Sequence, residues 1–169
     1  MDLNGHIHLL SGPVQGGKTT YMAEQVDSWK NKGLRVKGFL CPGLMAGGRR
    51  TEFSLMNIQT GHKLLMGREE KIAGWVKYRR FYFNPEAFRQ GKAWINEALA
   101  EPTDLLLIDE VGPMELEGLG WSELLDSLEQ QTNTKQLWVV RKEIVPEVSR
   151  RWHIPDQLVY TTKFLKIPF

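Results

Sequence analysis

Cysteine is almost missing from this sequence of 169 residues, in which Cys41 is the single example. One thiol excludes an internal disulfide, so packing and hydrogen bonds have to hold the fold. Low cysteine use is typical of proteins kept in a reducing compartment. We therefore expect a cytoplasmic protein.

Long hydrophobic runs are also missing. No apolar stretch approaches the roughly 20 residues that a membrane-spanning helix needs. Residues 1–5 lack the basic segment followed by an apolar run that marks a secretory signal. We expect no membrane partner.

A large excess of one charge is missing as well, because 22 Lys and Arg residues stand against 20 Asp and Glu residues. The net charge of +2 is too small to indicate a nucleic acid or a membrane surface as the partner. We find neither internal repeats nor low-complexity segments, and the length suits one domain with a real core. We expect residues 1–169 to form a single domain.

What the sequence does contain, near its start, is the glycine-rich segment SGPVQGGKTT at residues 11–20. It fits G-x-x-x-x-G-K-[ST], the phosphate-binding P-loop. An expected strand at residues 6–10 precedes it and an expected helix at residues 18–32 follows it. That helix carries Met22, Val26 and Trp29 on one face. Strand, glycine loop and helix thus occur in the order that the motif requires.

The residue types of this segment indicate its chemistry. Backbone N–H groups of the loop and the helix N-terminus face anionic oxygens. Lys18 is expected to neutralise the β- and γ-phosphates, and the Thr19 hydroxyl to bind Mg²⁺. The expected phosphate-binding set is Gly12, Pro13, Val14, Gln15, Gly16, Gly17, Lys18, Thr19 and Thr20.

A second landmark is the segment DLLLIDE at residues 104–110. A nearly continuous apolar run indicates a central parallel strand covered on both faces, and its acids emerge at the carboxyl end, where open α/β sheets bind ligands. Asp109 is expected to act on Mg²⁺ together with Thr19. Glu110 is then free to orient and deprotonate an attacking water. A kinase needs no water-activating group, so the acidic pair favours hydrolysis.

The remaining pattern predicts an α/β fold: a P-loop NTPase three-layer sandwich with a mostly parallel central sheet. A β-hairpin insertion after the second strand is predicted from residues 51–58 and 63–66. The glycine-rich basic segment at residues 45–50 is expected to be a flexible loop. Arg141 ends a strand expected between the P-loop strand and the Asp109 strand. There it either contacts the nucleotide or is an ordinary surface arginine.

Three other features have two interpretations each. Residues 77–83 mix basic and aromatic side chains, as in a platform for single-stranded nucleic acid or a strand with one aromatic face. The small charge favours the strand, and we expect no nucleic-acid partner. Glu115 is either an acid near Mg²⁺ or a helix cap. His6 and His8 share a strand face and are interpreted as structural rather than as metal ligands.

The segment DEVGPMEL at residues 109–116, together with residues 12–19, resembles the THEP-type nucleoside-triphosphatases. These are small one-domain P-loop proteins of the RecA-like division. Further similarity lies at residues 37–39, 48–50 and 82–88, and the resemblance fades after about residue 116. It implies Mg²⁺-dependent hydrolysis of nucleoside triphosphates to diphosphates, with loose base selectivity and slow turnover.

Carried over by residue, the resemblance implies phosphate and metal roles for Lys18 and Thr19, and metal and water roles for Asp109 and Glu110. It also implies a catalytic role for Arg50. The sequence departs from the family pattern in two places: Glu52 replaces a glycine, while Gly43 and Met45 replace a glutamate and an arginine. We expect Glu52 to pair with Arg50 and hold it away until nucleotide binds.

The leading hypothesis is a Mg²⁺-dependent nucleoside-triphosphatase acting on ATP or GTP, with Glu110, Lys18 and Arg50 as catalytic residues. One alternative is a nucleotide-dependent switch module, in which hydrolysis is a slow timer and the hairpin changes order with the γ-phosphate. Another is a small-molecule kinase, with Glu110 as the base for its acceptor. The preferred base and any protein partner stay open.

Overall fold

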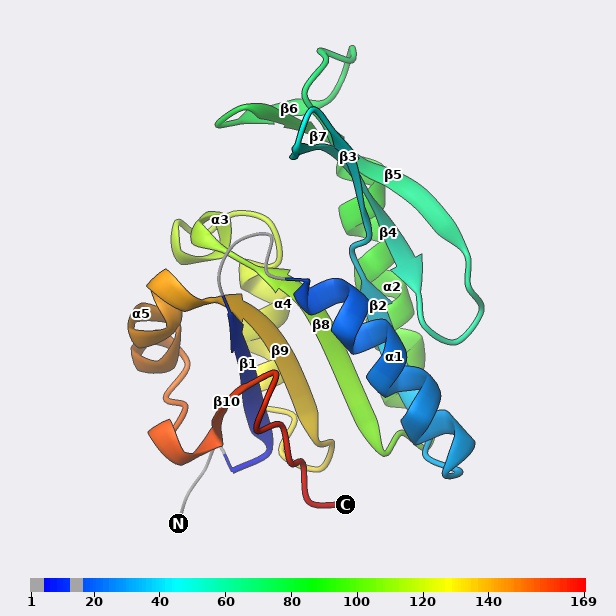
Figure 1. Ribbon diagram of the computed structural model, residues 1–169, viewed down its shortest axis with the longest axis vertical. Coiled ribbons are helices and arrows are strands. Elements are labelled where there is room, and N and C mark those ends of the chain that lie inside the picture. Colours follow the sequence, from blue (N-terminus) through cyan, green and yellow to red (C-terminus); the bar gives the residue numbers. More distant parts are fainter. Residues whose placement is uncertain (1–4, 13–16) are drawn as a thin grey trace.

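The protein, seen in a computed structural model that describes residues 5–12 and 17–169, is built on one mixed sheet (Figure 1). Within these residues the sheet has ten strands: nine follow the order β10-β1-β9-β8-β2-β4-β5-β7-β6, and β3 pairs with β4 beside this path. Neighbouring strands in the first half of the order are parallel, and those in the second half are antiparallel.

The parallel half forms the centre of the molecule. Its strands are β1 (Ile7–Gly12), β2 (Val36–Leu40), β8 (Leu105–Val111), β9 (Gln136–Arg141) and β10 (Val159–Thr161). A short 3-10 helix, η2 (Asp156–Leu158), takes the start of the strand that we expected at residues 157–161. Strand β9 lies between β1 and β8, which confirms the predicted place of the strand that ends at Arg141.

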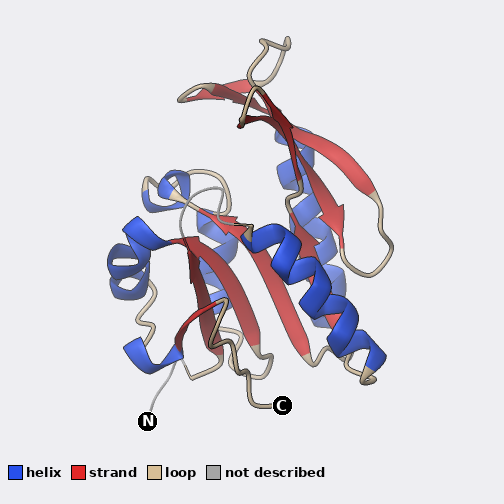
Figure 2. Ribbon diagram, in the orientation of Figure 1, coloured by secondary structure: helices blue, strands red, loops and turns tan. Residues whose placement is uncertain are grey.

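Helices cover both faces of this sheet (Figure 2). Helix α1 (Lys18–Asn31) lies on one face, where Met22, Val26 and Trp29 pack against Leu105 and Leu107. The other face carries α2 (Pro85–Ala100), α4 (Ser122–Glu129) and α5 (Val145–Arg151), together with the alternate β8 residues that face them. Because successive strand residues point to opposite faces and both faces are covered, β8 is apolar from Leu105 to Ile108, before its two acids. The predicted three-layer sandwich is confirmed, and in the described part of the chain every helix is too short or too polar to cross a bilayer.

The β-hairpin insertion after β2 is also confirmed. Strand β4 (Arg49–Asn57) pairs antiparallel with β2 and with β5 (Lys63–Arg68), and it continues the sheet away from its parallel half. The Asn57 side chain accepts hydrogen bonds from the N–H groups of Gln59 and Thr60 at 2.8 and 3.0 Å, which fixes the turn. An asparagine in this role is common in turns because its amide imitates a backbone carbonyl.

The expectation of a flexible loop at residues 45–50 is wrong. Strand β3 (Gly43–Ala46) pairs with the start of β4, and Gly47 and Gly48 form the turn between them with φ of 60° and 76°. Two positive φ angles in succession suit the turn that connects a tight hairpin, and glycine adopts them without strain. The glycines therefore build a hairpin here.

Residues 77–83 form two short strands and not one. Strand β6 (Val76–Tyr78) turns through Arg79 and Arg80 into β7 (Phe81–Phe83), and Arg79 has φ of 53°. Phe81 and Phe83 pack edge-on against Phe53 of β4, so the aromatic side chains join the hairpins to one another. This packing agrees with the structural interpretation of the segment.

Candidate functional site

The carboxyl ends of β1 and β8 and the N-terminus of α1 meet at one edge of the sheet. Gly12 ends β1, Gly17 begins the helix with φ of 75°, and Lys18, Thr19 and Thr20 form its first turn. The other members of the expected phosphate-binding set, Pro13, Val14, Gln15 and Gly16, lie outside the described residues.

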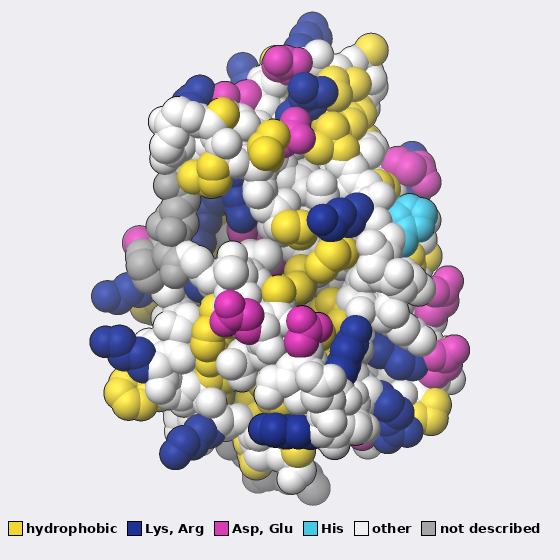
Figure 3. Space-filling view, turned by 45° about the vertical axis from the view of Figure 1, so that its right-hand side comes forward, with side chains coloured by type: hydrophobic (Ala, Val, Ile, Leu, Met, Phe, Trp, Pro, Cys, Tyr) yellow, Lys and Arg dark blue, Asp and Glu magenta, His cyan; other side chains and the backbone are white. Residues whose placement is uncertain are grey.

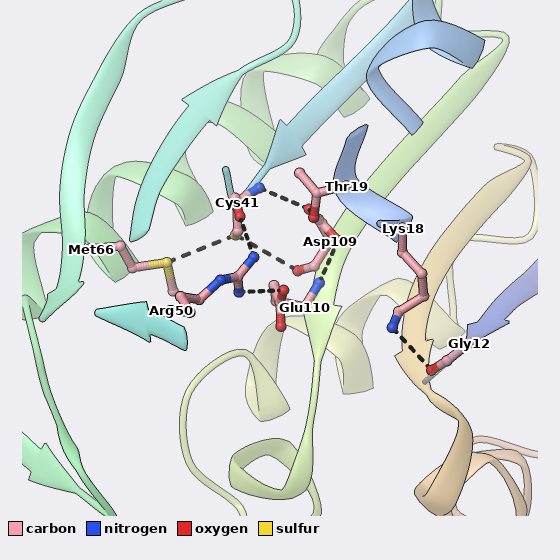
Figure 4. A network of polar contacts seen from close by, with 8 residues as sticks. All are labelled: Gly12, Lys18, Thr19, Cys41, Arg50, Met66, Asp109 and Glu110. Carbon is pink, nitrogen blue, oxygen red and sulfur yellow. Dashed lines mark hydrogen bonds and ion pairs between the residues drawn. The ribbon is translucent and has the colours of Figure 1, made fainter. Parts of the chain in front are cut away.

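Thr19 and Asp109, 90 residues apart in the sequence, are in direct contact (Figure 4). The Thr19 hydroxyl donates to Asp109 Oδ2 at 2.9 Å, and the Cys41 backbone N–H donates to the same oxygen at 2.9 Å. The Glu110 N–H donates to Asp109 Oδ1 at 3.0 Å. The carboxylate of Asp109 is thus held in one orientation between α1, β2 and β8.

Burial sets the electrostatics of Asp109, whose side chain is fully inaccessible to solvent. Burial raises the pKa of Asp109 above its ordinary value, and the nearby charge of Glu110 raises it further, while the donors from Cys41 and Thr19 act in the opposite direction. Because the net effect is a raised pKa, these donors offset only part of the cost of burying the charge.

Thr19 and Asp109 fit the needs of Mg²⁺. This ion prefers oxygen ligands and is usually bound through one or two carboxylates together with phosphate oxygens and water. Within residues 5–12 and 17–169, no group of three or more His, Cys, Asp and Glu side chains is arranged to hold a metal by itself. A hydroxyl and a single buried carboxylate match a site that phosphate oxygens and water complete.

Glu110 follows Asp109 in an unusual backbone conformation, with φ of 64°. The pairing of β8 with β9 shifts register between Ile108 and Val111, so Glu110 lies in a bulge at the strand end. Left-handed backbone is strained for a residue other than glycine, and such strain often marks a functional position. Here it accompanies the bulge at the end of β8.

The Glu110 carboxylate forms an ion pair with Arg50 of β4, with Nη1 and Oε1 2.7 Å apart. Their side chains are 28% and 22% exposed, so the pair is only partly screened by water. Arg50 Nη2 also donates to the Cys41 carbonyl at 3.4 Å. The hairpin insertion thereby reaches the expected water-activating residue through a direct contact.

The expected pairing of Glu52 with Arg50 is wrong. Glu52 lies opposite Arg68 across the hairpin, and the charged atoms of these two side chains are 3.9 Å apart. Arg50 turns instead towards the end of β8. Arg49 is paired with Glu69 at 2.8 Å and does not line the site.

Gly43 explains how Arg50 reaches Glu110. A Cβ atom at position 43 would lie 2.3 Å from Arg50 Nε, so the guanidinium occupies space that any side chain at that position would need. The departure from the family pattern at Gly43 therefore goes together with the observed position of Arg50. Sequence reasoning noted this glycine as a loss of charge and missed its packing role.

Lys18 and Arg141 complete the polar side of the site. Lys18 Nζ donates to the Gly12 carbonyl at 3.0 Å, and burial lowers the pKa of Lys18, an effect that the charge of Arg141 strengthens. Arg141 stands beside Gly12 across the β1–β9 pair. Both side chains line the same cavity as Thr19 and Glu110, which measures about 830 Å³. Its size lies within the range of about 300–1,000 Å³ that ligand pockets occupy.

The contacts of Glu115 are those of a cap. Its two oxygens accept from the N–H groups of Gly112 and Trp121 at 2.8 and 3.3 Å, which fixes the start of helix α3 (Pro113–Leu116) and the segment that follows it. Burial raises the pKa of Glu115 to about 7, although both backbone donors lower it.

His8 Nδ1 lies 3.2 Å from the Tyr160 hydroxyl, a contact between β1 and β10 that agrees with a structural role.

Sequence reasoning missed the apolar wall of the cavity. Figure 3 shows a hollow between the part of the molecule that carries the hairpins and the body below it, with charged side chains inside. The apolar wall comes from segments far apart in the sequence, so periodicity within any one of them does not reveal it. The aromatic residues of that wall are Phe53, Phe81, Phe83, Phe88 and Trp121.

Comparison with known proteins agrees with the motifs. A protein-family model described as NTPase matches residues 7–160. The resemblance therefore continues well past residue 116, where we expected it to fade.

Curated relatives carry the same description. The nucleoside-triphosphatase THEP1 of Ignicoccus hospitalis is 34% identical over 107 residues, which are 63% of this chain and 59% of that protein. The nucleoside-triphosphatase THEP1 of Methanopyrus kandleri is 33% identical over 112 residues, which are 66% and 60% of the two chains. The matched segment thus spans 59–60% of the length of these two relatives.

Two solved structures share the fold. The solution structure of a human cancer-related nucleoside triphosphatase superposes with a TM-score of 0.63 at 23% identity, covering 93% of this chain and 87% of that one. The crystal structure of THEP1 from the hyperthermophile Aquifex aeolicus gives a TM-score of 0.66 at 20% identity, with coverages of 92% and 87%. The three-layer sheet with its hairpin insertion is a P-loop NTPase fold.

Proposed function

The chain belongs to the NTPase family, and from this membership we propose that it is an enzyme that hydrolyses nucleoside triphosphates to diphosphate and phosphate with Mg²⁺. The observation that carries the proposal is the hydrogen bond between Thr19 and Asp109. It joins the first turn of α1 to the end of β8, which is where a P-loop enzyme needs its phosphate and metal ligands together.

Each polar residue of the site has a role in this proposal. The N–H groups at the start of α1 and the Lys18 ammonium bind the β- and γ-phosphates. Thr19 and Asp109 hold Mg²⁺, whose contribution when bound is to neutralise charge on the phosphate oxygens. Glu110 orients the attacking water and accepts its proton. Arg50 and Arg141 lie at the same cavity and offer positive charge to the phosphates.

The ion pair between Arg50 and Glu110 gives this proposal an order of events. While the pair is intact, the Arg50 guanidinium occupies one oxygen of the Glu110 carboxylate and keeps water from it. A bound triphosphate brings anionic oxygens that compete for Arg50. Arg50 then turns to the phosphates, and the carboxylate becomes available to water.

The test is phosphate release from a panel of nucleoside triphosphates, with and without Mg²⁺. We expect release from ATP or GTP that requires the metal, and loss of release in Lys18→Ala, which serves as the control for contaminating phosphatases. Absence of release from every nucleotide tested, with the chain folded and nucleotide bound, overturns the proposal.

A small-molecule kinase is the second candidate, and the cavity favours it because the lining continues past Glu110 to a group of aromatic residues. Glu110 would then accept a proton from an acceptor hydroxyl. Product analysis separates the two functions, since a kinase leaves the γ-phosphate on an acceptor and a hydrolase leaves it free.

Three further points complete the proposal. ATP or GTP is the expected nucleotide, and no nucleic acid or membrane is needed. We also propose a cytoplasmic location, since the single cysteine, Cys41, is buried and free. The two apolar clusters lie on opposite faces of one sheet, which supports a single domain.

A further inference from the structure

The cavity beside Glu110 has an aromatic wall that the proposed hydrolysis does not use. Its rings make consecutive contacts: Phe53 with Phe83 at 5.5 Å, Phe83 with Phe88 at 6.0 Å, and Phe88 with Trp121 at 4.6 Å between centroids. Phe81 contacts Phe53 at 5.3 Å. Strands β4 and β7, helix α2 and the segment before α4 each supply part of this wall, so the tertiary fold assembles it.

The part of the cavity with the aromatic wall, called the aromatic half below, also has flexible side chains in its lining. Met66 of β5 and Met114 of α3 line it. Methionine side chains adapt to ligand shape and make favourable contacts with aromatic rings.

The rim of this half carries positive charge. Arg79, at the turn between β6 and β7, lines the cavity, is exposed and stacks over Tyr78 at 5.5 Å. Arg80 is paired with Glu69 and Arg50 with Glu110, whereas Arg79 makes no ion pair within the described part of the chain. A molecule in the aromatic half would therefore meet a guanidinium whose charge is available to an anion.

The position of the aromatic half excludes the nucleotide itself as its occupant, and this step rests on the proposed function. Glu110 faces the γ-phosphate if it activates water. The γ-phosphate is the far end of the triphosphate, and the base is attached through the α-phosphate. Space beyond Glu110 on the hairpin side thus lies past the end of the nucleotide.

We propose that the aromatic half of the cavity is a second ligand site, which binds a small aromatic molecule with an anionic group beside the nucleotide. The rings and the two methionines hold its aromatic body, and Arg79 pairs with its anionic group. The β4–β5 hairpin and the β6–β7 hairpin together supply most of the residues named for this site, which gives them a role in recognition in addition to their place in the sheet.

The experiment uses anilinonaphthalene sulfonate as the anionic aromatic probe, on the full chain saturated with Mg²⁺ and a non-hydrolysable ATP analogue. NMR of isotope-labelled methionine methyl groups locates the probe. We expect saturable shifts at Met66 and Met114 and none at Met22, which is buried on the inner face of α1 in the other apolar cluster. Absence of saturable shifts at Met66 and Met114 while the nucleotide analogue is bound, or equal shifts at Met22, overturns the proposal.

A charge variant tests the proposed pairing of Arg79 with the anionic group of the ligand. Arg79→Ala should weaken sulfonate binding about two- to fivefold, as expected for an exposed ion pair, and leave binding of the neutral phenylnaphthylamine unchanged. Lys77→Ala is the matched control, since Lys77 is a cation on the same hairpin that does not line the cavity. An equal effect of both variants, or no effect of Arg79→Ala, contradicts the assignment of the rim. Phosphate release is measured separately without probe, so failure of the proposed hydrolysis is recognised independently.

Discussion

At the scale of single residues, the Arg50–Glu110 contact decides how the proposed chemistry is regulated. The pair joins the hairpin insertion to the end of β8 across 60 positions of the sequence. Its two side chains are partly exposed, so water screens the pair in part and limits its net stabilisation. The structure thus places the expected base and the expected arginine in direct contact.

Glu110→Gln separates binding from chemistry. Glutamine keeps the size and the hydrogen bond to Arg50 but cannot accept a proton. We expect nucleotide binding close to that of the wild type and a turnover lower by roughly a hundredfold or more, the usual contribution of general-base catalysis. Single-turnover phosphate release is the measurement, and Glu97→Gln on the exposed side of α2 is the control. A rate within a few-fold of the wild type removes Glu110 from the role of base.

Gly43→Ala tests the position of Arg50 without changing Arg50 itself. The new Cβ takes the space of Arg50 Nε, and the flexible guanidinium moves away while the backbone stays. We expect Gly43→Ala and Arg50→Ala each to lower kcat more than they raise KM, because the charge is lost mainly from the transition state.

The double variant makes this prediction specific. If Gly43→Ala acts through Arg50, the combination should be no slower than Arg50→Ala alone, as expected for two changes that act on one contact. Arg49→Ala, which removes the neighbouring cation paired with Glu69, should have little effect. Additive losses in the double variant contradict a shared mechanism.

The raised pKa of Glu115 predicts that the free energy of unfolding depends on pH. Burial raises the pKa of Glu115 from 4.5 to about 7 in the folded chain. The folded state then holds the proton more tightly than the unfolded state, so this stabilisation is fully present below pH 4.5 and is lost as the pH rises through 7. The free energy of unfolding should fall across that interval by up to about 1.4 kcal/mol per pH unit.

The measurement is urea unfolding at a series of pH values. Glu115→Gln should flatten the slope, and its absolute stability is not the readout because the amide also changes the cap. Glu97→Gln should keep the wild-type slope. Equal slopes in all three proteins mean that Glu115 does not titrate in this interval.

At the scale of elements, the start of helix α2 is hydrogen-bonded to the hairpin insertion. Asn84 begins it: the side chain accepts from the Glu86 N–H at 3.1 Å and donates to the Leu65 carbonyl of β5 at 2.9 Å. One side chain thus caps the helix and ties it to the insertion. Asn84 followed by Pro85 is a pattern typical of a helix start, but it does not indicate the contact with β5.

Asn84→Ala should lower the free energy of unfolding by about 1–2 kcal/mol, since it removes both the cap and the link to β5. Asn96→Ala is a matched control within the same helix. Asn96 is exposed in the interior of α2, where alanine is the better helix former, so stability should stay or rise slightly. Chemical denaturation compares the two, and similar losses in both would argue against the capping role.

Strands and helices of the parallel half were predictable because each carries its own pattern. The apolar run before Asp109 indicates a strand covered on both faces, and Met22, Val26 and Trp29 mark the inner face of α1. The hairpin at residues 47–48 was missed because its two glycines permit either a flexible loop or a tight turn. Tertiary pairing of β3 with β4 decides between them, and local sequence does not record it.

The residues of the site also fall into those that the sequence predicts and those that it does not. Thr19 and Asp109 were predictable because a motif fixes each one to the end of a regular element. Arg50 and Glu52 were not, since which of them reaches Glu110 depends on the register of an antiparallel hairpin and on the free space at Gly43. The aromatic wall was harder still, because several separate elements contribute to it.

At the scale of the whole molecule, the site lies where the two halves of the sheet meet. The parallel half supplies the phosphate and metal residues, and the antiparallel half supplies Arg50 and much of the cavity wall (Figure 1). A nucleotide that contacts both halves stabilises the folded chain against global unfolding, because the unfolded chain lacks the site. The gain is about 2.7 kcal/mol at a ligand concentration of 100 times Kd.

For a domain of this length such a gain raises Tm by roughly 5–10 °C. We expect that shift with Mg²⁺ and a non-hydrolysable triphosphate, and a clearly smaller one when Mg²⁺ is removed by a chelator. Lys18→Ala should lose most of the shift, because the β- and γ-phosphates lose their cation. Lys32→Ala, an exposed lysine at the other end of α1, should keep it. Differential scanning calorimetry measures the Tm of the wild type, Lys18→Ala and Lys32→Ala with and without the nucleotide. A full Tm shift in Lys18→Ala would mean that the nucleotide binds elsewhere on the molecule.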